Sequence, residues 1–124
     1  MRVERELMRG AGPIAVLKLL EGGEKYGYEL VQALEQQSNG ALAMGQSTLY
    51  PMLYNLEAKK LITATRRASD SGRVRKYYRL TDRGTKRLEA ETKQWTALTE
   101  AMTSLGILAT RGGRTSMPAP GALA

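Results

Sequence analysis

The chain has 124 residues, of which 42% are hydrophobic and 25% are charged, and its formal net charge is +7. This length fits one small domain, and the absence of Cys and His excludes disulfides, thiolate nucleophiles, imidazole bases and the usual zinc or haem ligands. We therefore expect no metal and no cofactor, and we do not expect an enzyme, because the acidic residues are scattered and no glycine-rich phosphate loop is present.

The location of the chain is predicted from its hydropathy. The longest apolar stretch, residues 11–20, is interrupted by Pro13 and Lys18 and is too short to span a bilayer. Charges of both signs precede this stretch, and no small-residue cleavage site follows it, which argues against a signal peptide. We expect a cytoplasmic protein without a membrane partner.

The positive charge is concentrated in one segment. Residues 59–87 contain eleven Lys or Arg residues and two Asp residues, a sum of +9, whereas residues 1–58 sum to −2 and residues 88–124 to zero. A basic surplus confined to one segment makes a local positive field, and the commonest partner of such a field is a phosphate backbone.

The first half of the chain predicts helices. Residues 1–11 form an N-terminal extension with some helical character, and Pro13 is expected at the first position of a helix that ends at Gly22 and Gly23. A second helix is expected over residues 28–37. A third is expected over residues 48–59, with Ser47 as its N-cap and Pro51 at the edge of its first turn.

The third helix supplies the first group of candidate site residues. Leu49, Leu53 and Leu56 recur at helical spacing and are expected to face the core. Polar side chains then face outward, where hydroxyl groups suit phosphate oxygens and an amide can read adenine. The expected DNA-contacting residues of this helix are Ser47, Thr48, Tyr50, Tyr54 and Asn55.

A hairpin follows, with strands expected over residues 62–67 and 74–80 and a turn that contains Gly72. Alternation places Tyr78 on the inner face and most of the Arg side chains on the solvent face. Guanidinium groups on such a ribbon suit phosphates or a narrow minor groove. The expected contacts from this wing are Arg66, Arg67, Arg73, Arg75, Lys76 and Arg79.

A long helix is expected over residues 82–108, capped by Thr81, with a disordered tail over residues 109–124. Its apolar residues follow a heptad spacing that needs a partner, for which we favour a second copy of the chain. The single Trp has two interpretations, an anchor of the dimer interface, which we favour, or a stacking wall for a flat aromatic effector. The expected dimerisation residues are Leu88, Trp95, Leu98, Met102 and Leu105.

The predicted fold class is mainly α with a small β-hairpin, namely a winged helix-turn-helix over residues 12–81 followed by a long C-terminal helix. We expect a partner of double-stranded DNA. The alternative is a winged-helix module that binds RNA or protein without operator specificity, and a steep salt dependence with a preference for duplex DNA would distinguish the two.

The chain resembles the PadR-type transcriptional regulators over residues 12–88. The motifs that carry this resemblance are Tyr26-Gly27-Tyr28-Glu29-Leu30, Ser47-Thr48-Leu49-Tyr50-Pro51-Met52-Leu53 with Leu56-Glu57, and Arg75-Lys76-Tyr77-Tyr78-Arg79-Leu80-Thr81 with Gly84.

The resemblance implies a homodimeric repressor that binds a near-palindromic operator and is released by a small-molecule effector. By position, Ser47, Thr48, Tyr50 and Tyr54 would line the major groove, and the wing arginines would contact the backbone. Lys60 departs from the family pattern, because a glycine commonly ends the recognition helix there, and it implies a less abrupt helix end.

Overall fold

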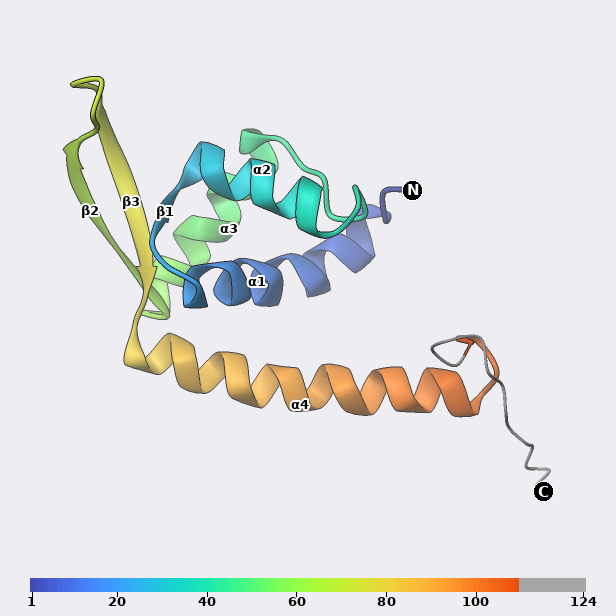
Figure 1. Ribbon diagram of the computed structural model, residues 1–124. Helices are drawn as coiled ribbons and strands as arrows, with labels where there is room; N and C mark the ends of the chain where they lie inside the picture. Colours follow the sequence, from blue (N-terminus) through green and yellow to red (C-terminus); the bar gives the residue numbers. More distant parts are fainter. Residues whose placement is uncertain (110–124) are drawn as a thin grey trace. The chain divides into compact units, whose positions relative to one another are not determined.

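The computed structural model describes residues 1–109, and the elements follow one another in the expected order of three helices, a hairpin and a long helix (Figure 1). This order confirms the predicted fold class. The predicted disordered tail lies outside the described residues except for Ala109. The helices are α1 (Arg5–Glu21), α2 (Gly27–Gln37), α3 (Gln46–Ala58) and α4 (Asp82–Ser104), and the strands are β1 (Lys25–Tyr26), β2 (Ile62–Ala68) and β3 (Val74–Leu80).

The chain divides into two compact units, Met1–Ala90 and the part from Glu91 onward. The first unit contains α1 to α3, all three strands and the first part of α4. The second unit contains the remainder of α4, which is helical as far as Ser104. Within residues 1–109, no helix is both long enough and apolar enough to cross a membrane.

Helix α1 begins earlier than predicted, at Arg5, so Pro13 lies inside the helix and not at its first position. Contacts that are distant in sequence account for the difference. Met8 is buried in the core, and the Val3 amide donates a 3.0 Å hydrogen bond to the Ala41 carbonyl, which holds the chain just before the helix.

The sheet has the strand order β1-β3-β2, and all its pairings are antiparallel. The hairpin of β2 and β3 confirms the predicted strands, with Ile62 opposite Leu80 at its base and Ala68 opposite Val74 near its tip. Strand β1 was not predicted, because two residues are too few to show an alternating pattern. It pairs Lys25 with Tyr78 and Tyr26 with Tyr77.

Both ends of α3 differ from the prediction. The N-cap is Gly45, and Ser47 lies inside the first turn, because the helix starts at Gln46. Pro51 consequently falls in the second turn. At the other end, Lys60 adopts a left-handed conformation with φ 62°, so the expected less abrupt end is wrong. The Leu61 amide bonds to the Leu56 carbonyl at 3.0 Å and the Lys60 amide bonds to the Glu57 carbonyl at 2.9 Å, which is the Schellman arrangement usually made with glycine.

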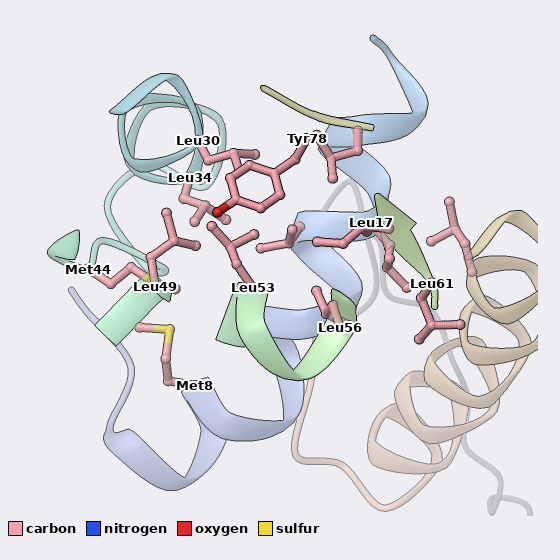
Figure 2. Packing of buried hydrophobic residues seen from close by; sticks show 14 residues of the cluster. Met8, Leu17, Leu30, Leu34, Met44, Leu49, Leu53, Leu56, Leu61 and Tyr78 are labelled. Atoms are coloured by element: carbon pink, nitrogen blue, oxygen red, sulfur yellow. The ribbon is translucent and has the colours of Figure 1, made fainter. Parts of the chain in front are cut away.

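The core joins the three helices to the sheet, and Figure 2 shows Leu30 and Leu53 beside the Tyr78 ring. Leu49, Leu53 and Leu56 are at most 5% exposed, so one side of α3 is fixed against the core as predicted. Leu88 of α4 is also buried here, with 4% exposure. Its side chain is thus covered within one chain, and its predicted role in the dimer interface stays a prediction.

Candidate nucleic-acid interface

The side of α3 that faces away from the core is polar and exposed. All five predicted site residues of this helix lie there: Ser47, Thr48, Tyr50, Tyr54 and Asn55. The core leucines determine this arrangement. At 3.6 residues per turn they form one stripe against the core, and the side chains on the remaining sides of the helix point away from that stripe. Tyr54 is 73% exposed and Tyr50 is 44% exposed.

Tyr50 is held by the start of α2. A Cβ atom built on Gly27 would collide with the Tyr50 hydroxyl, so the tyrosine ring packs directly over a glycine backbone. The start of α2 is itself fixed, because the Tyr26 amide donates a 3.1 Å hydrogen bond to the Glu29 carboxylate. Tyr50 is therefore a positioned side chain with one exposed edge.

A groove of about 560 Å³ separates the N-terminal ends of α2 and α3 from the tip of β3. Gln46 and Tyr50 line it on the helix side, and Arg73, Arg75 and Lys76 line it on the wing side. Cations and exposed polar side chains of α3 therefore border one groove, which suits a negatively charged backbone next to this helix.

The wing arginines fall into two groups, which differ in the contacts that their side chains make within the chain. Within residues 1–109, the side chains of Arg66 and Arg73 have no hydrogen-bond or ion-pair partner. Arg79 is exposed and donates one 3.2 Å hydrogen bond to the Thr65 hydroxyl. These three guanidinium groups remain available for an external anion.

The second group is stacked on tyrosines along one face of the sheet. The guanidinium of Arg67 lies 3.9 Å from the Tyr77 ring centroid, and that of Arg75 lies 4.3 Å from the Tyr26 ring centroid. The two rings meet edge to face, with centroids 5.6 Å apart. Arg67 and Arg75 are therefore pre-positioned by cation–π contacts.

Arg67 is also neutralised within the chain. It donates a hydrogen bond to Glu24, and this contact lowers the pKa of the Glu24 carboxyl and raises the pKa of Arg67. Both groups are exposed, so water weakens their attraction. Arg67 can still approach a phosphate, but only in competition with a carboxylate.

Lys76 lies on the opposite face of β3, toward α3. Its ammonium is 3.3 Å from the Glu57 carboxylate and 5.4 Å from the Tyr78 ring centroid. Burial raises the pKa of the Tyr78 phenol, which therefore stays protonated at neutral pH. Lys76 links the wing to α3, and its charge is partly used in that contact.

The predicted dimerisation residues beyond Leu88 all lie in the second unit. Leu98 is 44% exposed and Leu105 is 74% exposed, whereas Trp95 and Met102 are half-buried. The first three lie on one side of α4, which ends at Ser104 and not at residue 108 as predicted, and Leu105 follows directly after the helix. The structure contains one chain, and the dimerisation role of these residues stays a prediction.

Three residues of this surface, Gln46, Gly27 and Glu24, were not predicted as parts of it. Gln46 was not predicted because the start of α3 was placed two residues too late. Gly27 and Glu24 act through contacts with Tyr50 and Arg67, and each pair is too far apart in sequence for any spacing rule to connect it. The run Tyr26-Gly27-Tyr28 was noted as a motif, but its packing role required the fold.

The chain is similar to known proteins over most of its length. Residues 16–90 match the family described as "Transcriptional regulator PadR-like family". A Streptococcus transcriptional regulator has a similar crystal structure, with 33% identity, a TM-score of 0.73, and coverage of 83% of this chain and 99% of that one. The PadR-like transcriptional regulator BC4206 from Bacillus cereus strain ATCC 14579 is 31% identical, with a TM-score of 0.72 and coverage of 81% and 95%.

A third similar structure contains nucleic acid. It is Bacillus subtilis PadR in complex with operator DNA, with 27% identity, a TM-score of 0.61, and coverage of 66% of this chain and 46% of that chain. The shared part is therefore about half of the Bacillus subtilis protein.

Proposed function

Since the chain belongs to the PadR-like family of transcriptional regulators, we propose that it is a homodimeric repressor that binds a near-palindromic operator in double-stranded DNA. The observation that carries the proposal is the exposed polar side of α3, bordered by a groove whose other wall is the basic wing. The similarity to Bacillus subtilis PadR, which was crystallised with operator DNA, supports duplex DNA as the partner.

The proposal assigns two kinds of contact. The major groove of B-DNA is about 12 Å wide and admits one helix, so α3 would place Ser47, Tyr54 and their exposed neighbours against base edges and phosphates. The wing cations would contact the backbone and supply affinity that does not depend on sequence. Arg66, Arg73 and Arg79 are assigned the direct contacts, since none of them makes an ion pair within the described residues. Arg79 interacts with Glu24 only through its more distant charge.

A homodimer is proposed because α4 exposes apolar residues at heptad spacing. Two copies related by a two-fold axis would present two copies of α3 to half-sites about 34 Å apart, one turn of DNA. A small-molecule effector is the second part of this proposal, and Trp95 is the residue at which a flat aromatic compound could stack. The DNA, dimer and effector roles are separable by experiment.

The first experiment is selection of bound duplexes from a random-sequence pool, followed by affinity measurements from about 50 to 200 mM salt. We expect enrichment of an inverted repeat with half-sites about one turn apart. Weak binding without enrichment would contradict operator recognition and favour the RNA- or protein-binding alternative.

The variant that tests the wing is Arg66→Gln with Arg73→Gln. We expect the slope of log affinity against log salt to fall by about 1.8 for each bound subunit, at about 0.9 per lost phosphate contact, with an equal loss on all sequences. Arg83→Gln with Lys86→Gln is the matched control, because both side chains are exposed on α4 and line neither groove beside α3. An unchanged slope in the wing variant would refute the wing assignment.

A further inference from the structure

A second groove borders α3, on the side away from the wing. It has a volume of about 380 Å³ and lies between α1 and α3. Thr48 and Asn55 line it from α3, and Arg5, Arg9 and Lys59 bring three cations to it. Met8 and Met52 also line this groove and make part of its wall apolar.

The three cations have no partner in the chain. Arg5, Arg9 and Lys59 are all exposed, and within residues 1–109 none of their side chains has an ion pair or a hydrogen bond. Arg5 and Arg9 are four residues apart on α1, a spacing at which like charges repel and destabilise a helix. All three cations therefore remain available to an external anion.

The position of this cluster relative to α3 indicates which anion fits. At about 100° per residue, Tyr50 in the wing-side groove and Asn55 in the second groove lie about 140° apart around the helix. Ser47 and Tyr54 are exposed between them. The two grooves thus lie on either side of the outward ridge of α3, one bordered by the hairpin and the other by the N-terminal half of α1.

A helix with its side chains is about 10–12 Å across, which matches the width of the major groove. A recognition helix that fills this groove has one phosphate backbone along each of its sides. The wing supplies cations for one backbone, and the cluster on α1 and at the end of α3 faces the position of the other.

We propose that Arg5, Arg9 and Lys59 form a second phosphate-contact site, which binds the DNA strand opposite the one held by the wing. This inference rests on the proposed function and adds to it a backbone contact from α1. The two contacts together would fix the position of α3 across the groove, so that it is held from both sides.

The test uses the full chain with Arg5→Gln and Arg9→Gln on the selected operator. Two lost phosphate contacts should lower the salt slope by about 1.8 for each bound subunit. The loss of affinity between 50 and 200 mM salt should then be smaller than for the unmodified protein by about twelvefold for each bound subunit, or about 150-fold for a dimer on the operator. Ethylation interference should lose phosphates at one edge of each half-site, whereas Arg66→Gln with Arg73→Gln should lose those at the other edge.

The outcomes separate this inference from the function on which it rests. If the unmodified protein fails to bind duplex DNA, the proposed function is wrong. If the protein binds and the wing variant lowers the slope, but the α1 variant behaves like the Arg83→Gln, Lys86→Gln control, the second site is refuted. Loss of the same phosphates in both variants would also overturn it, because the two sites would then share one strand. Equal far-ultraviolet circular dichroism spectra and unfolding midpoints for all variants show that the comparison concerns contacts and not folding.

Discussion

Lys60 adopts a backbone conformation that is unfavourable for a residue with a side chain, and the surrounding fold maintains it. It occupies the left-handed position after α3, where a Cβ atom costs about 1–2 kcal/mol relative to the usual backbone conformations. The conformation persists because Leu56 and Leu61 are both buried and the two hydrogen bonds that close the helix depend on it. The strain of Lys60 is therefore offset by its neighbours.

We predict that Lys60→Gly stabilises the protein by about 0.5–1 kcal/mol. Removing the left-handed strain stabilises the folded chain by about 1–2 kcal/mol. About 0.4–1 kcal/mol of this gain is lost, because glycine has more conformational freedom in the unfolded chain. Lys60→Ala is the control, since it removes the same charge and keeps the strain. Urea unfolding at an unchanged m-value measures both variants, and a Gly variant no more stable than the Ala variant contradicts the argument.

The wing shows what residue types alone can predict of a site. Charge and alternation correctly identified the basic hairpin and the burial of Tyr78. They could not distinguish Arg66 and Arg73 from Arg67 and Arg75, because stacking on tyrosines and pairing with Glu24 depend on strands and loops that the fold brings together. Sequence thus predicts which residues carry charge, and the packed structure determines which charges are free.

At the scale of elements, hydrogen bonds join the start of α4 to the residues that directly follow α3. The Thr81 hydroxyl accepts a 2.9 Å hydrogen bond from the Gly84 amide, which confirms the predicted N-cap. The same hydroxyl lies 2.8 Å from the Lys60 carbonyl and 3.0 Å from the Leu61 carbonyl. A Cβ atom on Gly84 would collide with the Leu61 carbonyl oxygen, so the two segments approach as closely as backbones can.

We predict that Gly84→Ala destabilises the protein by about 1–3 kcal/mol, because the obstructing atom belongs to the backbone and cannot rotate away. Gly10→Ala is the matched control, since Gly10 also lies inside a helix and has nothing within 4 Å of an added Cβ. That change should stabilise the protein by about 0.5–1 kcal/mol. Thermal or urea unfolding measures the stability of both variants. A Gly84→Ala variant as stable as the parent would contradict the prediction, because it would show that the two backbone segments can move apart at no cost.

The element predictions succeed where the signal is local and fail where it is not. The hairpin and the cap of α4 follow from alternation and from one hydroxyl, and both are correct. The start of α1 was misplaced because burial of Met8 and a bond to Ala41 overcome the local preference of Pro13 for a helix start. Strand β1 exists only because β3 lies beside it.

At the scale of the whole molecule, the net charge of each segment did not identify the basic residues of α1. The segment from residue 59 to residue 87 was identified by its +9, but Arg5 and Arg9 lie in a segment that sums to −2. The fold places these two arginines beside Lys59 at one groove. Net charge per segment is therefore a good guide to the wing and a poor guide to the opposite side of α3.

The last prediction concerns assembly. Helix α4 extends for 23 residues, and Trp95, Leu98, Met102 and Leu105 follow a heptad spacing. Exposed apolar side chains on such a stripe mark an interface, and a second copy of the chain would cover them. We predict that Trp95→Ala raises the dimer dissociation constant by at least about 30-fold, the effect of losing about 2 kcal/mol at a central aromatic anchor.

Sedimentation over a range of concentrations measures this constant, with Thr96→Ala, an exposed neighbour on the same helix, as the control. Operator binding by the Trp95→Ala variant should then depend more steeply on protein concentration, since DNA must assemble the dimer from monomers. At concentrations above the new dissociation constant, the affinity should return, because the α3 and wing contacts are unchanged. An unchanged dissociation constant would contradict the interface role and leave the indole free to stack against an effector.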